Sequence, residues 1–354
     1  MGQTSMQTRI LHVTQVYAGG ISRAITSLIE LSPDAEHHLL WAGNEEPAAD
    51  VPYASIHTMP QSPKQMMTAI KRVREVVQEV KPDVVHAHSS FGGVYARLAN
   101  LDVPVFYEPH CYKFDDMQQS SAKRAVFRLA EKVLAKRSAA TVVLSPHEEE
   151  LAKALDSKAV THFLPNVATI QPSDRFPATG WKTERNVFMI GRLTGQKDPG
   201  YFAKVAEETL KLDPTVTFRW LGDVDGEDDG SGEAARQRLT AAGVDVLGWL
   251  NGDALAAELS RPALYFHSAH YEGFPLSVLD AAAFEHPLAV RSIPTFDGMH
   301  IPEAHSPQQS AQLVLDILNG GSERDRAIDA ASRLNNTMNR EAQREALRAL
   351  YASL

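Results

Sequence analysis

The feature that most constrains the fold is an alternation, maintained from end to end, of short apolar or β-branched runs with longer amphipathic stretches. Such alternation is typical of βα units, in which a helix carries the chain from one parallel strand to the next. The sequence therefore predicts an α/β protein. At 354 residues the chain is too long for one ordinary core, so we expect two domains.

The candidate elements form two sets separated by a polar segment. The first set has strands at 9–16, 37–43, 83–89, 103–109, 140–145 and 161–165, and helices at 21–31, 63–80, 119–137 and 146–155. Residues 166–184 are rich in Pro, Ser, Thr and Asp and lack periodicity, which predicts a linker. The second set has strands at 186–192, 216–222, 244–249, 263–268 and 287–292. Each set predicts one doubly wound, Rossmann-like parallel sheet.

Composition excludes several classes of function. A net charge of -9 and a pI near 5.9 argue against a general nucleic-acid binder, which needs a basic surface. Cys111 is the single cysteine, which excludes a disulfide framework and a cysteine-rich zinc site and fits a reducing compartment. No segment reaches the roughly 18 to 20 apolar residues that span a bilayer. We therefore expect a cytoplasmic protein without a nucleic-acid partner.

The junctions where strands give way to helices are the expected places for a ligand. In open α/β sheets, ligands bind beyond the carboxyl ends of the strands, where helix N-termini attract anions. At the first junction, in YAGGISRAI, Gly19 and Gly20 end a strand and open a helix. Without Cβ atoms they allow a phosphate or sugar to approach closely, although a simple tight turn would use the same residues.

The second junction, GRLTGQKDPG, carries two cations. Asp198 is expected to cap a helix that Pro199 begins, and Arg192 and Lys197 flank this helix N-terminus. Arg binds two oxygens at once and Lys acts as a point charge, so the pair suits a diphosphate. Surface cations without a ligand are the alternative.

The third junction, HSAHYEGFPLSVLD, places an acid at the mouth of an apolar helix. Glu272 follows a candidate strand, Gly273 permits a turn, and Pro275 suits the first helical turn, with a second acid, Asp280, in the helix. Glu272 is expected to face the ligand. An acid near a helix N-terminus is also stabilised by the helix dipole alone, which is the structural alternative.

These motifs resemble those of retaining glycosyltransferases of family 4 (glycosyl transferases group 1). EGFPLSVLD is similar to the E-x7-E signature of that family, and GRLTGQKDP is similar to its phosphate loop. The likeness continues in order through YAGGISRAI, KPDVVHAHSS, LSPHEEE, FLPNV, LGD and LGWL, so it covers nearly the whole chain. The resemblance implies the GT-B architecture, two facing Rossmann-like doubly wound domains with an interdomain cleft.

The resemblance also implies domain boundaries and roles. Residues 1–170 would present the acceptor, residues 171–335 would bind the nucleotide sugar, and a terminal helix at 338–353 would pack back on the first domain. The enzyme would be a metal-independent, retaining hexosyltransferase without a cofactor. It would move a sugar from a nucleotide-diphosphate donor to a hydroxyl of a glycan, lipid-linked or small-molecule acceptor.

Individual residues take roles from the same resemblance. Arg192 and Lys197 would hold the diphosphate, Glu272 would contact the donor sugar, and Asp280 would bind the ribose hydroxyls. His110 would sit beside the reaction centre, and Gly20 would offer a backbone N–H to a phosphate. The remaining donor-binding residues would be Gly19, Gly248 in VLGWL, Gly273, Phe274, Pro275 and Leu276.

The sequence departs from the family pattern at two places. The second acid is Asp280 rather than Glu, one methylene shorter, which affects the ribose contact. His286 stands where the family often has glycine. Two alternatives therefore stay open, namely a GT-B sugar-nucleotide epimerase or phosphorylase, and a non-catalytic partner of a glycosylation complex.

Two further features have competing interpretations. His86 and His88 share one face of a strand, but no carboxylate or Cys stands at a suitable ligand spacing, so packing is favoured over a metal site. Residues 122–140 combine Lys and Arg with an apolar stripe. This segment predicts either a core helix with a solvated face or a basic amphipathic helix on the inner face of the membrane.

Overall fold

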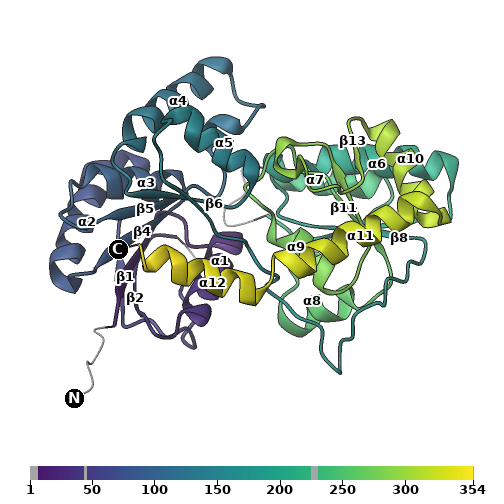
Figure 1. The fold of residues 1–354 in the computed structure, drawn as a ribbon. Coiled ribbons are helices and arrows are strands. Elements are labelled where there is room, and N and C mark those ends of the chain that lie inside the picture. Colours follow the sequence, from purple (N-terminus) through teal and green to yellow (C-terminus); the bar gives the residue numbers. More distant parts are fainter. Residues whose placement is uncertain (1–6, 44–45, 225–229, 354) are drawn as a thin grey trace. The chain divides into compact units, whose positions relative to one another are not determined.

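The structure, a computed structural model, describes residues 7–43, 46–224 and 230–353. The chain divides into two compact units, Met1–Asn166 with Arg340–Leu354, and Val167–Asn339. Each unit contains its own sheet with helices packed against it (Figure 1). Every pairing between these strands is parallel. The predicted α/β class with two doubly wound sheets is confirmed.

The first unit is built on a seven-stranded sheet of order β3-β2-β1-β4-β5-β6-β7. Its strands are β1 (Arg9–Thr14), β2 (Glu36–Trp41), β3 (Ser55–Thr58), β4 (Val84–His88), β5 (Val105–Glu108), β6 (Ala140–Val143) and β7 (Thr161–Phe163). Its helices are α1 (Gly19–Leu31), α2 (Met66–Val80), α3 (Ser89–Leu98), α4 (Ser121–Ala135), α5 (Pro146–Leu155) and α12 (Arg340–Tyr351), with short 3-10 turns at Pro63–Gln65 and Lys113–Asp115.

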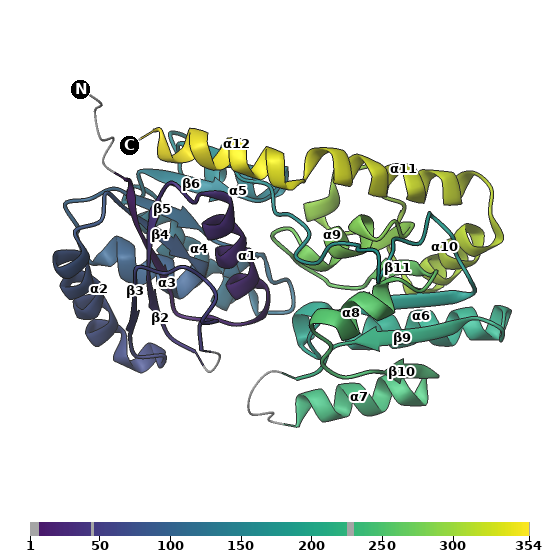
Figure 2. The same cartoon turned by 90° about the horizontal axis from the view of Figure 1, so that it is seen from below.

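Both faces of this sheet are covered. Alternate residues of β1 point to opposite faces, as a period of two requires. Leu11 and Val13 pack with α2 and α3 in one core cluster, and Ile10 packs with α1 and α12 in another. Figure 2 shows α1 and α12 on one side of the strands and α2 and α3 on the other. The face covered by α1 and α12, to which Ile10 points, also carries the polar residue His12, which is fully buried.

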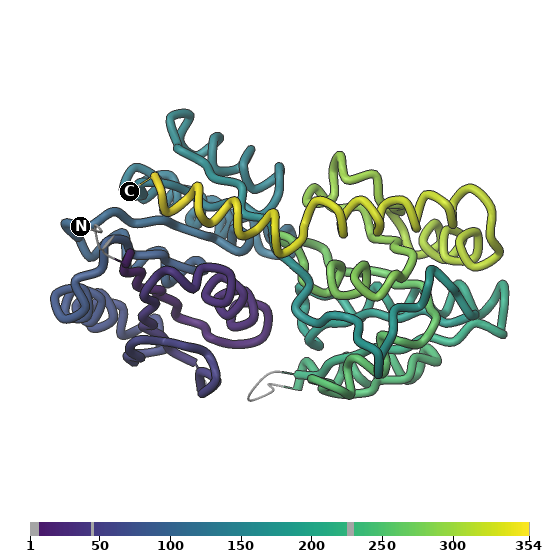
Figure 3. The backbone as a smooth tube through the Cα atoms, turned by 60° about the horizontal axis from the view of Figure 1, so that its bottom comes forward, coloured from purple at the N-terminus to yellow at the C-terminus, as the bar shows by residue number. Residues whose placement is uncertain are grey.

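The C-terminal helix α12 completes the first core. Leu347 and Leu350 are 1% and 0% exposed in the cluster that contains Ile10. The buried Gln343 accepts a hydrogen bond from Ser27 of α1 at 2.8 Å and donates one to the carbonyl of Pro165 at 2.8 Å. The tube in Figure 3 shows α12, the yellow end of the chain, beside α1.

The second unit is built on a six-stranded sheet of order β10-β9-β8-β11-β12-β13. Its strands are β8 (Asn186–Ile190), β9 (Thr217–Leu221), β10 (Val244–Val246), β11 (Leu264–His267), β12 (Leu288–Arg291) and β13 (Glu303–Ala304). Its helices are α6 (Pro199–Leu212), α7 (Ser231–Ala241), α8 (Gly252–Leu259), α9 (Leu276–Ala283), α10 (Pro307–Asn319) and α11 (Ser322–Thr337), with short 3-10 turns at Gly195–Lys197 and Pro294–Phe296.

Strands β3 and β13 and helix α3 have no counterpart among the elements expected from the sequence, and each has a local reason. The edge strand β3 has only four residues and β13 only two, so neither offers a readable alternation. Helix α3 contains Gly92 and Gly93, which weaken a helical pattern. A Cβ on Gly93 would lie 2.2 Å from the Tyr107 ring, so glycine is needed there for close packing against the sheet.

We expect that truncation of the buried face of α12 destabilises the first unit. Leu350→Ala removes a fully buried side chain and should cost about 2–5 kcal/mol. The matched control, Arg348→Ala, changes an exposed residue of the same helix and should cost less than about 0.5 kcal/mol. Urea denaturation followed by circular dichroism measures both, and equal stabilities would show that α12 is not part of this core.

Candidate functional site

The second sheet has a topological switch point between β8 and β11. From β8 the chain runs to β9 on one side, and it returns to β11 on the other side. In doubly wound sheets, ligands bind beyond the carboxyl ends of the strands at such a point. The two loops that meet there are residues 191–198 after β8 and residues 268–275 after β11.

An ion pair joins these two loops. The Lys197 ammonium contacts Oε1 of Glu272, and the two side chains are 16% and 8% exposed. Gln196 donates from Nε2 to Oε2 of Glu272 at 3.3 Å, and Nε2 of His267, at the end of β11, lies 3.4 Å from Oε1. The structure thus brings together two of the predicted site residues that are 75 positions apart in the sequence.

The charges around Glu272 keep it ionised. Burial alone would raise the pKa of the carboxyl, but the Lys197 ammonium and the His267 imidazole lower this pKa to about 2. Glu272 is therefore a carboxylate throughout the physiological range, held in a largely buried position. Such a group offers a fixed negative charge to whatever binds beside it.

Backbone contacts fix the two loops against each other. Ser268 donates from its hydroxyl to the carbonyl of Lys197 at 2.8 Å, and the backbone N–H of His270 donates to the carbonyl of Gln196 at 3.1 Å. Thr295 donates from Oγ1 to the carbonyl of Glu272 at 2.6 Å. The positions of Lys197 and Glu272 are therefore set by the backbone as well as by their own contact.

Glycines allow the close approach of these loops. A Cβ on Gly191 would lie 3.0 Å from Cγ of Lys197, so a larger residue would displace the Lys197 stem. A Cβ on Gly222 would lie 2.1 Å from the carbonyl oxygen of Gly191, and no shift of a flexible side chain could relieve that clash. Gly248, which forms a bridge to Gly222, has a φ of +72°, a conformation that favours glycine.

The predicted helix cap is present at the start of α6. Asp198 caps the helix by accepting a hydrogen bond from the backbone N–H of Tyr201 at 3.0 Å, and Pro199 is the first helical residue. Arg192 lies in the same loop and is partly buried. Arg291, the last residue of β12, donates to Oδ2 of Asp198 at 2.7 Å and lies over the Tyr201 ring.

Asp280 lies in α9 with its side chain fully buried. Its Oδ1 accepts hydrogen bonds from the backbone N–H groups of Thr169, at 2.6 Å, and Ile170, at 3.3 Å, and the Thr169 hydroxyl also donates to it. Donors from residues 169–170 therefore already contact the carboxylate to which the ribose role was assigned. The ribose contact stays a prediction.

The other residues of the predicted donor loop are buried around the start of α9. Gly273 and Pro275 are buried, Phe274 is 3% exposed with its ring against Phe296, and Leu276 is 8% exposed. Pro275 is the capping residue, and the helix begins at Leu276. These residues shape the loop that presents Glu272.

The departure at His286 lies away from this edge of the sheet. His286 precedes β12 and is fully buried, with Nδ1 3.0 Å from the carbonyl oxygen of Ala263 and Nε2 2.7 Å from that of Leu259. Ala263 precedes β11, so the imidazole sits at the amino ends of the strands. His286 therefore lies at the opposite ends of the strands from the Lys197–Glu272 loops.

The first sheet has its own switch point, between β1 and β4. Gly19 and Gly20 follow β1 and open α1, as expected; Gly19 has a φ of +56° and Gly20 is exposed. His110 follows β5 with its side chain 9% exposed. Its Nε2 lies 3.0 Å from Nδ1 of His88, and its Nδ1 lies 3.5 Å from Oε1 of Glu108.

Sequence reasoning missed several residues of these two clusters. Gln196, His267 and Arg291 were not singled out, although each stands at or just beyond the carboxyl end of a strand. Glu108 was also missed, because the carboxylate that faces His86 and His88 lies on the neighbouring strand rather than at a short sequence spacing. Position relative to strand ends was the signal that could have found them.

The sequence also predicts that the polar, glycine-rich segment 222–233 is a surface loop rather than a calcium site. Residues 225–229 of this segment lie outside the described residues, and α7 begins at Ser231. Among the helices described, none has both the length and the apolar character needed to span a membrane.

Comparisons with known proteins agree with this division of the chain. Residues 19–167 match the family model for the glycosyl transferase 4-like domain, and residues 172–334 match the model for glycosyl transferases group 1. A UDP-Gal:alpha-D-GlcNAc-diphosphoundecaprenol alpha-1,3-galactosyltransferase from Escherichia coli is 27% identical over 244 residues, 64% of this chain. The match spans 62% of the length of that protein.

Solved structures share the fold over nearly the whole chain. A sucrose-phosphate synthase from Thermosynechococcus elongatus has a TM-score of 0.79 at 15% identity, covering 98% of each chain. Anabaena Alr3699/HepE, in complex with UDP and glucose, has a TM-score of 0.77 at 14% identity, covering 98% of this chain and 100% of that one. At these identities the likeness shows the fold alone.

We expect stability to fall as the pH is lowered from about 6.5 to about 4. Burial lowers the pKa of His37 to about 4 and that of His286 to about 4, whereas an unfolded histidine titrates near pH 6.5. The unfolded chain then binds more protons, so the stability that these groups contribute is complete above about pH 6.5 and is lost toward pH 4.

Melting temperatures recorded between pH 7.5 and 4.5 measure this effect. His286→Gln should reduce the slope, because it removes one histidine that stays neutral only when folded. His305→Gln, which changes an exposed histidine, serves as the control and should leave the slope as it is. The same slope in all three proteins would contradict the account.

Proposed function

Because the chain belongs to the family 4 glycosyltransferases of the GT-B fold, we propose that it transfers a sugar from a UDP-sugar to a lipid-linked acceptor with retention of configuration and without a metal ion. The Lys197–Glu272 pair at the switch point of the second sheet carries this proposal. It supplies a cation for the leaving diphosphate and an anion for the sugar, side by side.

The charge that develops on the leaving group determines what the site must provide. As the bond between the anomeric carbon and the diphosphate breaks, negative charge accumulates on phosphate oxygens. Lys197 and Arg192 meet that charge beside the N-terminus of α6, so two protein cations do the work that a divalent ion does elsewhere. This is the reason to propose a metal-independent reaction.

Glu272 has the complementary role. Its carboxylate is ionised and largely buried, so it can hydrogen-bond a sugar hydroxyl and favour positive charge at the anomeric carbon. This carboxylate and Lys197 neutralise each other. A bound diphosphate would draw the ammonium away and leave Glu272 to the sugar. The acceptor hydroxyl then attacks the anomeric carbon from the face that the diphosphate leaves and gives its proton to an oxygen of the leaving phosphate, which gives retention.

The donor and acceptor classes rest on the relatives. The Escherichia coli relative is named for a UDP-Gal donor and a diphosphoundecaprenol-linked acceptor, and the Anabaena structure contains UDP and glucose. These names support a UDP-hexose as the donor of this chain and a polyprenyl-linked sugar as its acceptor. The product would then enter glycan, polysaccharide or glycolipid synthesis.

Helix α4 supports a lipid-linked acceptor. Val126, Leu129 and Val133 lie three and four residues apart, share one helix face and are 67%, 64% and 62% exposed. Only Glu131 and Leu134 of this helix are buried, so the interpretation as an ordinary core helix does not account for the apolar stripe. Exposed lysines accompany it at positions 123, 132 and 136. Since the protein as a whole is acidic, this basic, apolar face suits an anionic membrane surface.

We expect Lys197→Met and Glu272→Gln each to lower kcat/KM at least tenfold, about 1.4 kcal/mol of transition-state stabilisation, in a UDP-hexose transfer assay. Both substitutions keep the side-chain volume. Lys211→Met, an exposed lysine of α6, is the matched control and should retain the activity of the unaltered protein. The anomeric configuration of the product, read by NMR, tests retention, and addition of EDTA tests metal independence.

Three results would overturn the proposal in different ways. Wild-type rates in both site variants would remove Lys197 and Glu272 from the reaction. Formation of an epimer without acceptor would point to the epimerase alternative. UDP-sugar binding, seen as a raised melting temperature, without turnover across an acceptor panel would point to a non-catalytic partner.

The membrane contact has a separate test. We expect the protein to sediment with vesicles that contain phosphatidylglycerol and not with phosphatidylcholine vesicles. Lys123→Glu/Lys132→Glu/Lys136→Glu should reduce the bound fraction at least tenfold, since each lysine near an anionic surface contributes about 1 kcal/mol. Lys71→Glu/Lys204→Glu/Lys211→Glu makes the same charge change on other helices and should bind as the unaltered protein does. Equal loss in both triple variants would rule out α4 as the contact.

A further inference from the structure

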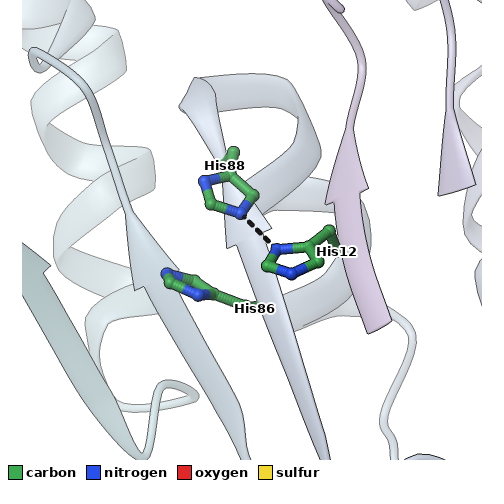
Figure 4. Close-up of side chains that lie close together, drawn as sticks. All are labelled: His12, His86 and His88. Atoms are coloured by element: carbon green, nitrogen blue, oxygen red, sulfur yellow. Dashed lines mark hydrogen bonds between the residues drawn. The ribbon is translucent and has the colours of Figure 1, made fainter. Parts of the chain in front are cut away.

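A row of polar residues crosses one face of the first sheet from strand to strand. The register pairs His12 of β1 with His86 of β4, and His88 of β4 with Glu108 of β5. His37 of β2 pairs with Ile10, so it lies next to His12 on the same face. Figure 4 shows His12 on one strand beside His86 and His88 on the next. His12, His86 and His88 are fully buried.

Hydrogen bonds connect four of these imidazoles end to end. Nε2 of His110 lies 3.0 Å from Nδ1 of His88, whose Nε2 lies 3.0 Å from Nδ1 of His12 (dashed in Figure 4). Nε2 of His12 lies 3.0 Å from Nδ1 of His37, and Nε2 of His37 ends the row 3.2 Å from the carbonyl oxygen of Ser32. The row therefore runs from Ser32, which caps the C-terminal end of α1, to His110.

The contact of His37 with Ser32 determines which nitrogen donates in each hydrogen bond of the row. The Ser32 hydroxyl donates to the carbonyl of Leu28 at 2.5 Å, so it faces His37 only as an acceptor. Nε2 of His37 therefore carries the proton, because both of its neighbours are acceptors. Burial lowers the pKa of His37 to about 4, so the neutral ring accepts at Nδ1.

The same reasoning passes along the row. Nε2 of His12 must donate to His37, and Nε2 of His88 must donate to His12, since burial lowers the pKa of both rings and keeps them neutral. Nδ1 of His88 is then an acceptor, and Nε2 of His110 must carry the proton that bonds to it. The proton on Nε2 of His110 is thus set by the carbonyl of Ser32, with the rings of His88, His12 and His37 between them.

Glu108 closes the row on its other side. Its carboxylate is 1% exposed, and three imidazole nitrogens lie near it, namely Nε2 of His86 at 3.1 Å, Nδ1 of His88 at 3.3 Å and Nδ1 of His110 at 3.5 Å. The Tyr351 hydroxyl lies 3.2 Å from Nδ1 of His86. Burial lowers the pKa of His110, and the Glu108 carboxylate beside Nδ1 opposes that lowering.

A metal ion does not explain this cluster as well as hydrogen bonds do. The ligand atoms of His12, His86 and His88, and those of His88, Glu108 and His110, lie within 4.8 Å of one another. A metal would need a lone pair from each ring. The 3.0 Å contacts that link His12, His88 and His110 instead require one N–H for each contact.

The backbone at the end of the row is strained. His110 has a φ of 53° and Cys111 a φ of 108°, both outside the conformations that residues with a side chain prefer. Strain of this kind is kept only where the surroundings over-determine it, and it concentrates at functional sites. The contacts of His110 with His88 and Glu108 are such surroundings.

We propose that Glu108 and the imidazole row His88–His12–His37 form a positioning network that sets the protonation and orientation of His110 for sugar transfer. This inference rests on the proposed function and assigns contact with a substrate to His110, which follows β5 at the carboxyl edge of the first sheet. Glu108, His88, His12 and His37 act through His110. No proton needs to travel along the row, because its role is to hold one tautomer.

The groups that face His110 come from several elements. The ionisable groups around the cluster are Glu108 on β5, His86 and His88 on β4, His12 on β1, Glu148 on α5 and Tyr351 on α12. Among them Glu108 raises the pKa of His110, and His86 lowers it, against a larger lowering by burial. Removal of the Glu108 charge must therefore move the titration of His110 to lower pH.

The first test compares Glu108→Gln, which keeps the shape, with the unaltered protein. We expect kcat to fall about tenfold with the KM for the UDP-sugar within about twofold, because ground-state binding lies elsewhere. The limb of the pH–kcat profile that His110 sets should move to lower pH by about one unit. Glu108→Asp keeps the charge and should restore most of that limb. His305→Gln, which changes an exposed histidine, is the control and should alter neither kcat nor the position of the pH limb.

The second test does not depend on activity. Nitrogen-15 NMR of the histidine-labelled protein at pH 7.5 should show Nε2 protonated in His12, His37, His88 and His110. A bare Nε2 on His110, or an unmoved pH limb in Glu108→Gln, would overturn the network. If the protein transfers no sugar at all, the proposed function fails while the NMR result still decides the tautomers. Stoichiometric zinc in the purified protein, with lost His–His bonding, would replace the network with a metal site.

Discussion

The buried ion pair between Lys197 and Glu272 is the interaction on which the functional account depends. A largely buried pair of this kind adds little net stability, since the loss of hydration costs several kcal/mol per ion, yet removal of one partner leaves an uncompensated charge. In the second unit, Gln196 and His267 contact the Glu272 carboxylate, and Ser268 and His270 donate to the carbonyls of Lys197 and Gln196. Thr295 donates to the carbonyl of Glu272. In this state each charge is held ready for an opposite charge from a ligand.

The two sheets use the same topological device with different chemistry. Each reverses its strand order once, and the residues of interest lie at that reversal. In the second sheet the residues there are a cation and an anion on loops. In the first sheet a row of buried imidazoles runs along the strands themselves, and only His110 reaches the surface. An ion pair suits the binding of charge, whereas a row of hydrogen-bonded rings suits the orientation of one side chain.

Sequence patterns predicted the parallel sheets, the cap at Asp198 and the glycine turn at Gly19, because period, capping and turn chemistry are local properties. They failed at β3 and α3, where shortness and a packing glycine hide the pattern. They also missed Gln196, His267, Arg291 and Glu108. Those residues meet their partners across strands or loops, and the register between strands is not written in any short segment. At His286 the sequence differs from the family pattern, which suggested a change in function. The residue lies at the amino ends of the strands, away from Lys197 and Glu272.

The most direct test of the central claim is a crystal structure of the protein with UDP bound. The account predicts that the diphosphate lies beyond the carboxyl ends of β8 and β11, with a phosphate oxygen about 3 Å from Nζ of Lys197 and with that ammonium drawn away from Glu272. UDP bound elsewhere, with the contact between Lys197 and Glu272 unchanged, would contradict it.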